Sequence, residues 1–304
     1  MIKKTVIFTT YQCNNQCIFC INAERRNIPG KTTAEIKDEM IKARERGSTY
    51  LELIGGEFNI LPDAVPMVHF AKSLGFKTIM MATNGRIFSY LDFTKKMIDA
   101  GLTDIVFSIH GHTPELHDEL TQSPGSFEQL LKGLDNFKKL KFKNIGSNTT
   151  IVKQNYKILP EIGSLVFNLG IRNSEFIFVD PNHGGAKINF KKLVPKISEA
   201  VPYIKKTLDI GRGKSNHWHV RYVPLCYFED YLDQISEIYE IKQFQTEHIA
   251  PDFKNFSVEE SRALVGRKKT SRCKKCRLHD QCEGMWKNYL DYHGDNELKP
   301  IIDK

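Results

Sequence analysis

Seven cysteines are the residues of this chain whose type and spacing could do chemistry. They form one group of three near the start and one group of four toward the end: Cys13, Cys17 and Cys20, then Cys226, Cys273, Cys276 and Cys282. Four thiolates complete either a structural zinc site or an iron–sulfur cluster. Three thiolates leave one iron open to coordinate a small molecule, although a three-thiolate zinc site with a bound water has the same needs and the spacing alone does not exclude it.

The elements around the first cysteine group predict where it lies. Residues 4 to about 180 alternate short β-rich runs with amphipathic stretches, which is typical of βα units around a parallel sheet. The expected strands are 5–9, 50–54, 78–82, 104–109, 146–152 and 175–179, and helices are expected at 64–74 and 127–140. Six units are too few for a closed eightfold barrel. The predicted fold class is therefore α/β, a partial (β/α)6 TIM-like barrel, with the cysteines at the rim where barrel active sites are built.

Threonine and glycine residues mark several expected helix ends. The regular alternation of strand and helix patterns stops after residue 209. Thr33 before Glu35 favours a helix start, while Gly75 and Gly101 stand where helices should end. A helix over 190–207 leads into a segment rich in glycine and charge at 211–215, which is typical of a domain joint. Beyond it, 217–224 reads as a strand, 230–241 as mixed and the stretch after 264 as loop. The predicted domains are 1–209 and 210–304.

Composition and charge narrow the class of protein. With 40% hydrophobic and 26% charged residues, the composition is that of an ordinary globular protein. The apolar stretch in the opening MIKKTVIFTT is shorter than the core of a signal peptide and lacks a small-residue cleavage site, and no run approaches the ~20 apolar residues that span a membrane. We therefore expect a cytoplasmic protein with no membrane partner, in which cysteines are ligands rather than disulfides. The net charge of +8 permits an anionic substrate or partner.

Several motifs at the ends of the expected strands occur together and in order. The cysteine loop has Phe19 just before its last cysteine, and Gly55-Gly56-Glu57 ends the second expected strand. Thr83-Asn84-Gly85 ends the third strand and Ser108 the fourth. After the fourth strand come His110-Gly111, His117-Asp118 and Pro124-Gly125-Ser126-Phe127. The region of the fifth strand contains Asn148-Thr149-Thr150 and Asn155. Together these resemble the radical S-adenosylmethionine (SAM) superfamily over residues 4 to about 180.

The resemblance implies a cofactor and a reaction. Cys13, Cys17 and Cys20 would hold a [4Fe-4S] cluster whose open iron chelates SAM, and one electron would split SAM to methionine and a 5'-deoxyadenosyl radical. The pair Gly55-Gly56 would let the backbone approach the cofactor, and the Glu57 carboxylate would meet its ammonium group. Phe19, Thr83, Asn84 and Ser108 would also lie near SAM. Family members usually have proline after the glutamate, whereas this chain has Phe58, which puts the loop geometry in doubt.

The second cysteine group has a resemblance of its own. Cys273-x2-Cys276-x5-Cys282-x-Gly284 is similar to the C-terminal end of SPASM and twitch domains, with Cys226 as a distant fourth ligand. A full SPASM domain needs more cysteines than remain, so the resemblance implies a small cysteine-rich C-terminal domain of twitch type with one auxiliary [4Fe-4S] cluster. A four-cysteine zinc knot is the alternative.

Other residues are weaker candidates for chemistry. Asp180 and His183 begin an expected rim loop, and His110 and His112 lie on another; each could handle protons, and each could equally stabilise a turn. The basic stretch around the last cysteines could attract RNA or an acidic electron donor such as flavodoxin or ferredoxin. It lacks the interleaved aromatic residues that single-stranded nucleic acid prefers, so nucleic acid is not expected.

These expectations lead to one leading function and three alternatives. The leading one is a radical SAM enzyme that abstracts hydrogen from a peptide or protein during peptide maturation. Because the first strand is expected by residue 5, no leader-recognition domain precedes it, and a separate leader-peptide-binding protein or a leader-free substrate would be required. The alternatives are a small-molecule dehydrogenase or epimerase acting on sugars or alcohols, an RNA-modifying enzyme, and a non-catalytic metal-cluster-binding regulator.

Overall fold

The computed structural model describes residues 1–213 and 216–302. Nine strands form a sheet in the order β7-β6-β5-β4-β3-β2-β1-β8-β9, and the short strands β10 and β11 pair separately. The bounds are β1 Ile2–Phe8, β2 Tyr50–Ile54, β3 Thr78–Thr83, β4 Asp104–Ser108, β5 Ile145–Ile151, β6 Asn173–Phe178, β7 His217–Arg221, β8 Phe244–Ile249, β9 Lys254–Asn255, β10 Arg267–Lys268 and β11 Met285–Trp286. Among the described residues β7 and β9 are the sheet's edges, so the sheet is open and the predicted partial-barrel α/β class is confirmed.

The helices alternate with these strands as expected for βα units. Their bounds are α1 Thr33–Glu45, α2 Ala64–Ser73, α3 Leu91–Ala100, α4 Pro114–Thr121, α5 Ser126–Lys139, α6 Leu159–Asn168, α7 Gly184–Ile188, α8 Phe190–Leu193, α9 Ile197–Gly211, α10 Ser236–Gln243, α11 Val258–Ser261 and α12 Lys287–His293. No helix within the described ranges is long and apolar enough to cross a membrane.

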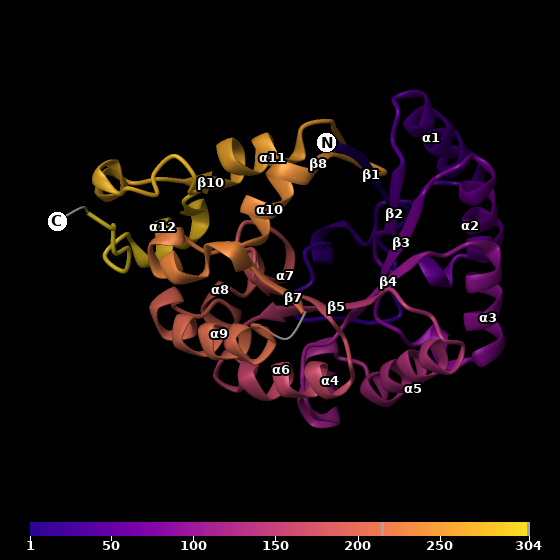
Figure 1. The fold of residues 1–304 in the computed structure, drawn as a ribbon, viewed down its shortest axis with the longest axis horizontal. Coiled ribbons are helices and arrows are strands. Elements are labelled where there is room, and N and C mark those ends of the chain that lie inside the picture. Colours follow the sequence, from indigo (N-terminus) through magenta and orange to yellow (C-terminus); the bar gives the residue numbers. More distant parts are fainter. Residues whose placement is uncertain (214–215, 303–304) are drawn as a thin grey trace. The chain divides into compact units, whose positions relative to one another are not determined.

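The chain folds into two compact units. The first contains Met1–Ile18, Glu24–Asn148 and Gln243–Val258, and the second contains Phe19–Ala23, Thr149–Lys242 and Glu259–Lys304. In the first unit, α1, α2 and α3 line one face of the strands β1 to β4 (Figure 1). Alternate residues of β2, Leu51 and Leu53, are fully buried in its core, as a strand covered by helices requires.

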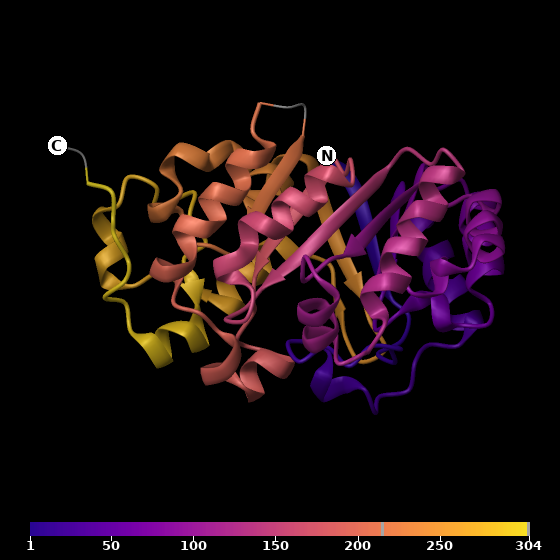
Figure 2. The same ribbon diagram turned by 90° about the horizontal axis from the view of Figure 1, so that it is seen from below.

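In the second unit, β6 and β7 pair in parallel and α6 lies beside α9 (Figure 2). The rings of Phe176 on β6 and Trp218 on β7 pack with their centroids 5.5 Å apart, and both side chains are buried. Such a ring pair contributes to the core beyond its buried area alone.

Local signals explain several helix ends. The first helix begins after Thr32 rather than Thr33: the Thr32 side chain accepts the Glu35 N–H, and the Glu35 carboxylate accepts the Thr32 N–H. This reciprocal pair is a capping box, which satisfies two otherwise unpaired donors. Gly101 follows α3 as its C-cap, and Gly75 follows the end of α2 by one further residue, as predicted.

The expected single helix over 190–207 is wrong. The chain forms α8 and α9 instead, separated at Pro195, which lacks an N–H and pushes Val194 into an extended conformation with φ −87° and ψ 111°. The strand expected over 217–224 ends at Arg221. Part of the expected joint at 211–215, residues 214 and 215, lies outside the described residues.

The sequence also gives no sign of β8. This strand pairs in parallel with β1, from Ile2 opposite Phe244 to Ile7 opposite Ile249, and β9 follows it antiparallel. The short segment from β8 to β9 therefore reaches the end of β1 from which the first cysteine loop departs.

Candidate active site

The glycine pair at the end of β2 lies against the backbone that leads into the first cysteine. The Gly56 N–H donates to the Thr10 carbonyl oxygen at 2.5 Å, and the Glu57 N–H donates to that of Gln12 at 2.8 Å. A Cβ on Gly55 would overlap the Thr10 carbonyl oxygen, and a Cβ on Gly56 would overlap that of Gln12. Gly55 also has φ +148°. The chain's own backbone therefore requires both glycines, in addition to any cofactor.

The Glu57 carboxylate is buried and fully engaged with its neighbours. Its Oε1 accepts hydrogen bonds from Asn59 Nδ2 at 2.6 Å and from the Thr83 hydroxyl at 2.7 Å. Its Oε2 accepts the Asn84 N–H at 2.8 Å. Burial raises the pKa of Glu57 to about 7, although the donors from Asn84, Thr83 and Asn59 lower it. The side chain is 2% exposed, so these bonds join β2 to the turn after β3 with solvent excluded.

Asn84 extends this arrangement to the first cysteine. Its side-chain Nδ2 donates to Asn14 Oδ1 at 2.6 Å and lies 3.6 Å from Cys13 Sγ. The Asn15 N–H also points at Cys13 Sγ, at 3.3 Å. Two N–H groups thus face this sulfur, an arrangement that stabilises a thiolate or a thiolate ligand.

Arg86, two residues after Asn84, fastens the same loop. Its Nη1 donates to the Asn14 carbonyl oxygen and to Asn15 Oδ1, and its Nε donates to Gln129 Oε1 on α5 at 2.6 Å. The guanidinium therefore fixes the loop after Cys13 through both backbone and side-chain oxygens.

The other two cysteines of the first group, Cys17 and Cys20, follow this loop in the chain and are held by other contacts. On either side of Cys17, the Gln16 and Ile18 N–H groups donate to the Thr121 and Leu120 carbonyl oxygens of α4, at 2.9 and 3.0 Å. Cys17 is therefore held in the first unit, as Cys13 is, whereas Cys20 and the buried Phe19 belong to the second.

Cys20 has its own contact in the second unit. Its carbonyl oxygen accepts the Gly185 N–H at 2.9 Å. Gly184, with φ +55°, lies so close that a Cβ would overlap the same oxygen. The glycines that begin α7 therefore hold the backbone at Cys20.

The fourth-strand segment holds a pair of buried histidines. Ser108 ends β4 opposite Asn148 and is half-buried. His110 and His117 stack with ring centroids 5.9 Å apart, and His117 Nδ1 accepts the His110 N–H at 3.3 Å. Burial lowers the pKa of His110 to about 3 and that of His117 to about 4. Both rings are therefore neutral near pH 7.

Asp118, next to His117, has a structural role. Its carboxylate accepts N–H groups from Gly125 and Phe127 and the hydroxyl of Ser126, all within 2.9 Å. These groups form the first turn of α5. Asp118 therefore stabilises the start of α5.

The Asp180 loop in the second unit is self-bonded. The Asp180 carboxylate accepts the Asn182 N–H at 2.8 Å and lies 2.9 Å from His183 Nδ1. Asn182 in turn donates to the Gly266 carbonyl oxygen and accepts the Asn288 N–H at the start of α12. The turn thereby fixes the start of α12. The His183 side chain is exposed, whereas that of Asp180 is mostly buried.

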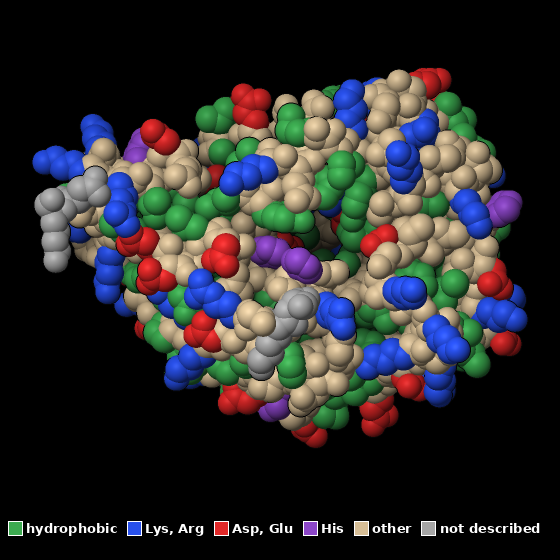
Figure 3. Space-filling view, viewed as in Figure 1, with side chains coloured by type: hydrophobic (Ala, Val, Ile, Leu, Met, Phe, Trp, Pro, Cys, Tyr) green, Lys and Arg blue, Asp and Glu red, His purple; other side chains and the backbone are tan. Residues whose placement is uncertain are grey.

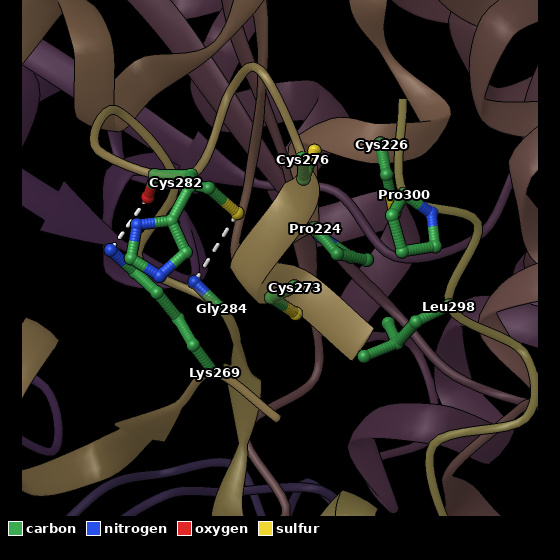
Figure 4. Close-up of a pocket in the computed structure, with 10 residues that line it drawn as sticks. Pro224, Cys226, Lys269, Cys273, Cys276, Cys282, Gly284, Leu298 and Pro300 are labelled. Atoms are coloured by element: carbon green, nitrogen blue, oxygen red, sulfur yellow. Dashed lines mark hydrogen bonds between the residues drawn. The ribbon is translucent and has the colours of Figure 1, made fainter. Parts of the chain in front are cut away.

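The four later cysteines line one pocket in the second unit (Figure 4). Cys226, Cys273, Cys276 and Cys282 share its wall with Lys269 and His279, among other residues. Backbone N–H groups face three of the sulfurs: Gly284 and Leu225 face Cys282 Sγ at 3.3 and 3.5 Å, Ile301 faces Cys276 Sγ at 3.4 Å, and the Lys299 backbone bonds Cys226. As they stand, no three His, Cys, Asp or Glu side chains of the described chain converge closely enough to hold a single metal ion.

Burial acts against free thiolates in this pocket. It raises the pKa of Cys226 to about 11 and raises that of Cys282 as well. A bound cationic group would reverse this preference, because thiolate ligands are deprotonated by the metal they bind. The pocket therefore supplies the ligand type that a four-cysteine site uses, with the four sulfurs around one cavity.

The basic residues near this pocket are partly neutralised. Arg272 pairs with Asp295 and Arg277 with Glu229. Figure 3 shows acidic side chains beside the basic ones at this end of the molecule. On the face that Figure 3 shows, basic side chains are therefore mixed with acidic ones rather than gathered into one basic patch.

Comparison with known proteins decides the family. A family model of the radical SAM superfamily matches residues 7–166, more than half of the chain and including the glycine pair, Glu57 and Asn84. The chain belongs to the radical SAM superfamily. Membership implies a [4Fe-4S] cluster and SAM. Two N–H groups face the sulfur of Cys13, which suits a thiolate ligand, and Cys17 and Cys20 are the other two ligands that the sequence predicts.

Curated relatives of this radical SAM protein have diverse names. An AdoMet-dependent heme synthase of Methanosarcina barkeri is 29% identical over 178 residues, which make up 58% of this chain and 50% of that protein. A probable GTP 3',8-cyclase of Saccharolobus islandicus is 26% identical over 221 residues, 71% of this chain and 69% of that protein. The matched part of this chain thus spans about half the length of the heme synthase.

Solved structures share the fold over nearly the whole chain. SuiB of Streptococcus suis, bound to the precursor peptide SuiA, has a TM-score of 0.68 at 16% identity and covers 100% of this chain and 75% of its own. The anSMEcpe protein with bound AdoMet and the Cp18Cys peptide has a TM-score of 0.66 at 12% identity, covering 99% and 93%. The shared fold therefore extends through the cysteine-rich end of the chain.

Sequence reasoning missed three contributors to this site. Asn59 follows Glu57 by two residues and Arg86 directly follows the Thr-Asn-Gly motif, so proximity to known motifs could have pointed to both. Asp252 had no such signal, because it follows the unpredicted β8. Its carboxylate accepts the hydroxyl of Tyr11, two residues before Cys13, and burial together with this bond raises the Tyr11 pKa to about 12.

Proposed function

We propose that this radical SAM protein cleaves SAM reductively and abstracts a hydrogen atom from a peptide or protein substrate. Cys13, Cys17 and Cys20 hold the cluster that binds SAM. When bound, the cluster supplies the electron that splits SAM into methionine and a 5'-deoxyadenosyl radical. An acidic electron donor such as flavodoxin or ferredoxin reduces the protein.

The chain's own residues position the reactants. Gly55 and Gly56 bring the end of β2 against the backbone before Cys13, while Thr83 and Asn84 place the end of β3 beside the same loop. Phe19, Ser108 and these residues line the SAM site. Their task is to hold a substrate C–H about 3 to 3.5 Å from the radical carbon, because hydrogen transfer needs a near-attack geometry.

The pocket of Cys226, Cys273, Cys276 and Cys282 holds an auxiliary [4Fe-4S] cluster in a twitch-type C-terminal domain. Four protein thiols line this one pocket, with backbone N–H groups facing three of them. Because four cysteines fill every ligand position of such a cluster, it does not bind substrate directly. The domain corresponds to the expected 210–304 region.

One observation supports a peptide as the substrate. The whole chain, including its cysteine-rich end, shares the fold of two structures solved with peptides bound. The sequence relatives favour a second candidate. They are a heme synthase and a GTP cyclase, and they support a small-molecule substrate.

Deuterium transfer tests the two candidates against each other. Anaerobic protein with SAM and a reductant is offered a set of deuterated candidate peptides, and in parallel deuterated GTP and heme precursors. We expect deuterium in 5'-deoxyadenosine from a peptide only. Transfer from GTP or a heme precursor, with none from the peptides, would replace the peptide reading by the small-molecule one.

A further inference from the structure

We propose that Asp252 is a positioning residue for the first cluster: its carboxylate fastens both ends of the segment 11–25, which carries the first three cysteines. The inference rests on the proposed function, because it takes these cysteines as the cluster ligands. Asp252 lies in the turn between β8 and β9, outside the residues 7–166 that match the superfamily model. A turn late in the chain thus becomes part of the radical site.

The pairing of β8 with β1 determines where this turn lies. The two strands run in parallel with Ile7 opposite Ile249, so the residues after Ile249 continue beside those after Ile7. The Ala250 N–H donates to the Phe253 carbonyl oxygen at 2.8 Å and closes the turn. The Phe253 ring packs against that of Phe8, with centroids 5.9 Å apart. The turn is therefore held where the chain leaves β1 for the cysteine loop.

The first end of the segment is Tyr11, two residues before Cys13. Tyr11 is 1% exposed, and its hydroxyl donates to the Asp252 carboxylate. On either side of Tyr11, the Thr10 and Gln12 carbonyl oxygens accept backbone N–H groups at the end of β2. The end of β2 thus holds the backbone around Tyr11, while the turn after β8 holds its side chain. Loss of the carboxylate would take this acceptor from a buried hydroxyl, which is unfavourable.

The second end of the segment is Arg25, five residues after Cys20. Its Nη1 donates to the Tyr11 hydroxyl oxygen at 3.5 Å, and its Nε lies 3.7 Å from Asp252 Oδ2. The guanidinium carbon also lies 5.0 Å from the centroid of the Phe253 ring, a cation–π distance. The side chains of Arg25 and Asp252 are 34% and 30% exposed, so solvent screens their attraction in part. Asp252 nevertheless contacts both residues that flank the cysteine segment.

Fastening both ends restricts the conformations of the segment between them. Cys13, Cys17 and Cys20 are each only half-buried, so burial alone does not hold them in place. Three thiols that must meet one cluster benefit from such restriction, because less conformational freedom remains to be lost when the cluster binds. Replacing a group that orients metal ligands typically weakens metal binding by about tenfold or more. We expect an effect of this size from the loss of the Asp252 carboxylate.

Cluster loss from anaerobically reconstituted protein tests this role. An iron chelator is added, and the first cluster is followed by the change that SAM causes in its EPR spectrum. Asp252→Ala should lose this signal about tenfold faster than the parent. Tyr11→Phe should also lose it faster, and the double variant should be no faster than Asp252→Ala, since both act through one hydrogen bond. Asp252→Asn should retain part of the parent's resistance, because its amide oxygen can still accept the Tyr11 hydroxyl.

Glu247→Ala is the matched control for a purely structural effect of the same segment. The Glu247 carboxylate on β8 accepts hydrogen bonds from Arg46 and from the Thr5 hydroxyl, and it has no part in the turn. Its loss should lower the stability of the protein and leave the rate of cluster loss unchanged. Equal acceleration in Glu247→Ala and Asp252→Ala, or a parent-like rate in Asp252→Ala, would overturn the inference. Tyr11→Phe keeps the ring, so it carries the same comparison where Asp252→Ala does not fold.

Alkylation of the cluster-free protein separates this inference from the proposed function. The rates at which iodoacetamide modifies Cys13 and Cys20 are measured by mass spectrometry of the digested protein. Both rates should rise in Asp252→Ala, because a half-buried thiol reacts through local opening of its loop, whereas the rate at Cys276 should not change. Unchanged rates at Cys13 and Cys20 would show that Asp252 does not hold the segment. A parent that binds no first cluster would overturn the proposed function, and these rates would still decide the inference.

Discussion

At the scale of single residues, the stacked pair His110 and His117 makes a prediction about acid stability. Both rings are buried and neutral in the folded protein, with pKa values of about 3 and 4, whereas an unfolded histidine titrates near 6.5. Between those values the unfolded state binds protons that the folded state does not. Stability is therefore lost as pH falls from about 6.5 toward 4, by about 1.4 kcal/mol per pH unit for each histidine.

Replacing one ring tests this directly. His117→Gln should flatten the loss of unfolding free energy between pH 6.5 and 5 relative to the parent, measured by urea denaturation at each pH. His69→Gln, at a histidine on α2 outside this pair, should leave the slope unchanged. Equal slopes in the parent and His117→Gln would show that the buried pair does not set the acid limit.

The same residue scale shows what the sequence could and could not predict. The motif Gly55-Gly56-Glu57 is visible in the sequence, and its place at the end of β2 was predicted. The reason for each residue was not, because it depends on partners distant in the chain. Only the folded backbone shows that the glycines face Thr10 and Gln12, and that Asn59, Thr83 and Asn84 surround the carboxylate.

At the scale of elements, a buried ion-pair network joins β7, α10 and the loops around β10 within the second unit. Arg262 pairs with Glu283 at 2.7 Å and with Glu240 at 3.4 Å, and Arg221 pairs with Glu175 and Glu240. The Arg262 and Glu283 side chains are 8% and 7% exposed. Removing one partner leaves buried charge uncompensated, which is strongly destabilising.

Arg262→Met should therefore lower the free energy of unfolding by about 3–5 kcal/mol, measured by chemical denaturation under anaerobic conditions. The exposed pair of Lys42 and Asp38 on α1 is the matched control, and Lys42→Met should cost at most about 0.5 kcal/mol. A loss in Arg262→Met no larger than in Lys42→Met would mean that solvent reaches the network.

Element prediction succeeded where one segment carries its own pattern. The strands β2 to β4 and the helices α2 and α5 lie within a residue of their expected bounds, because alternation and helical spacing mark them locally. Pro195 was a visible signal that the 190–207 interpretation overlooked. The strand β8 could not be found this way, because its register with β1 joins residues as far apart as Ile2 and Phe244.

At the scale of the whole molecule, the division of cysteines into two groups predicts two separable clusters. The ligands of the proposed auxiliary cluster all lie in the second unit, and none belongs to the loop of Cys13, Cys17 and Cys20. Anaerobically reconstituted protein should carry about eight iron and eight sulfide per chain. Zinc at about one per chain, with about four iron, would remove the auxiliary cluster and leave a structural zinc site in its place.

Two sets of variants test whether the clusters act independently. Replacing Cys13, Cys17 and Cys20 together by alanine should halve the iron and abolish SAM cleavage, while Cys276→Ala should also halve the iron yet keep SAM cleavage. Folding is the main confounder, because loss of one ligand can unfold a domain that depends on its metal. Circular dichroism and iron counting must therefore accompany the assay. Loss of SAM cleavage in a well-folded Cys276→Ala protein would show that the two clusters are coupled. Full conversion of substrate by that protein would show that the second cluster has a structural role only.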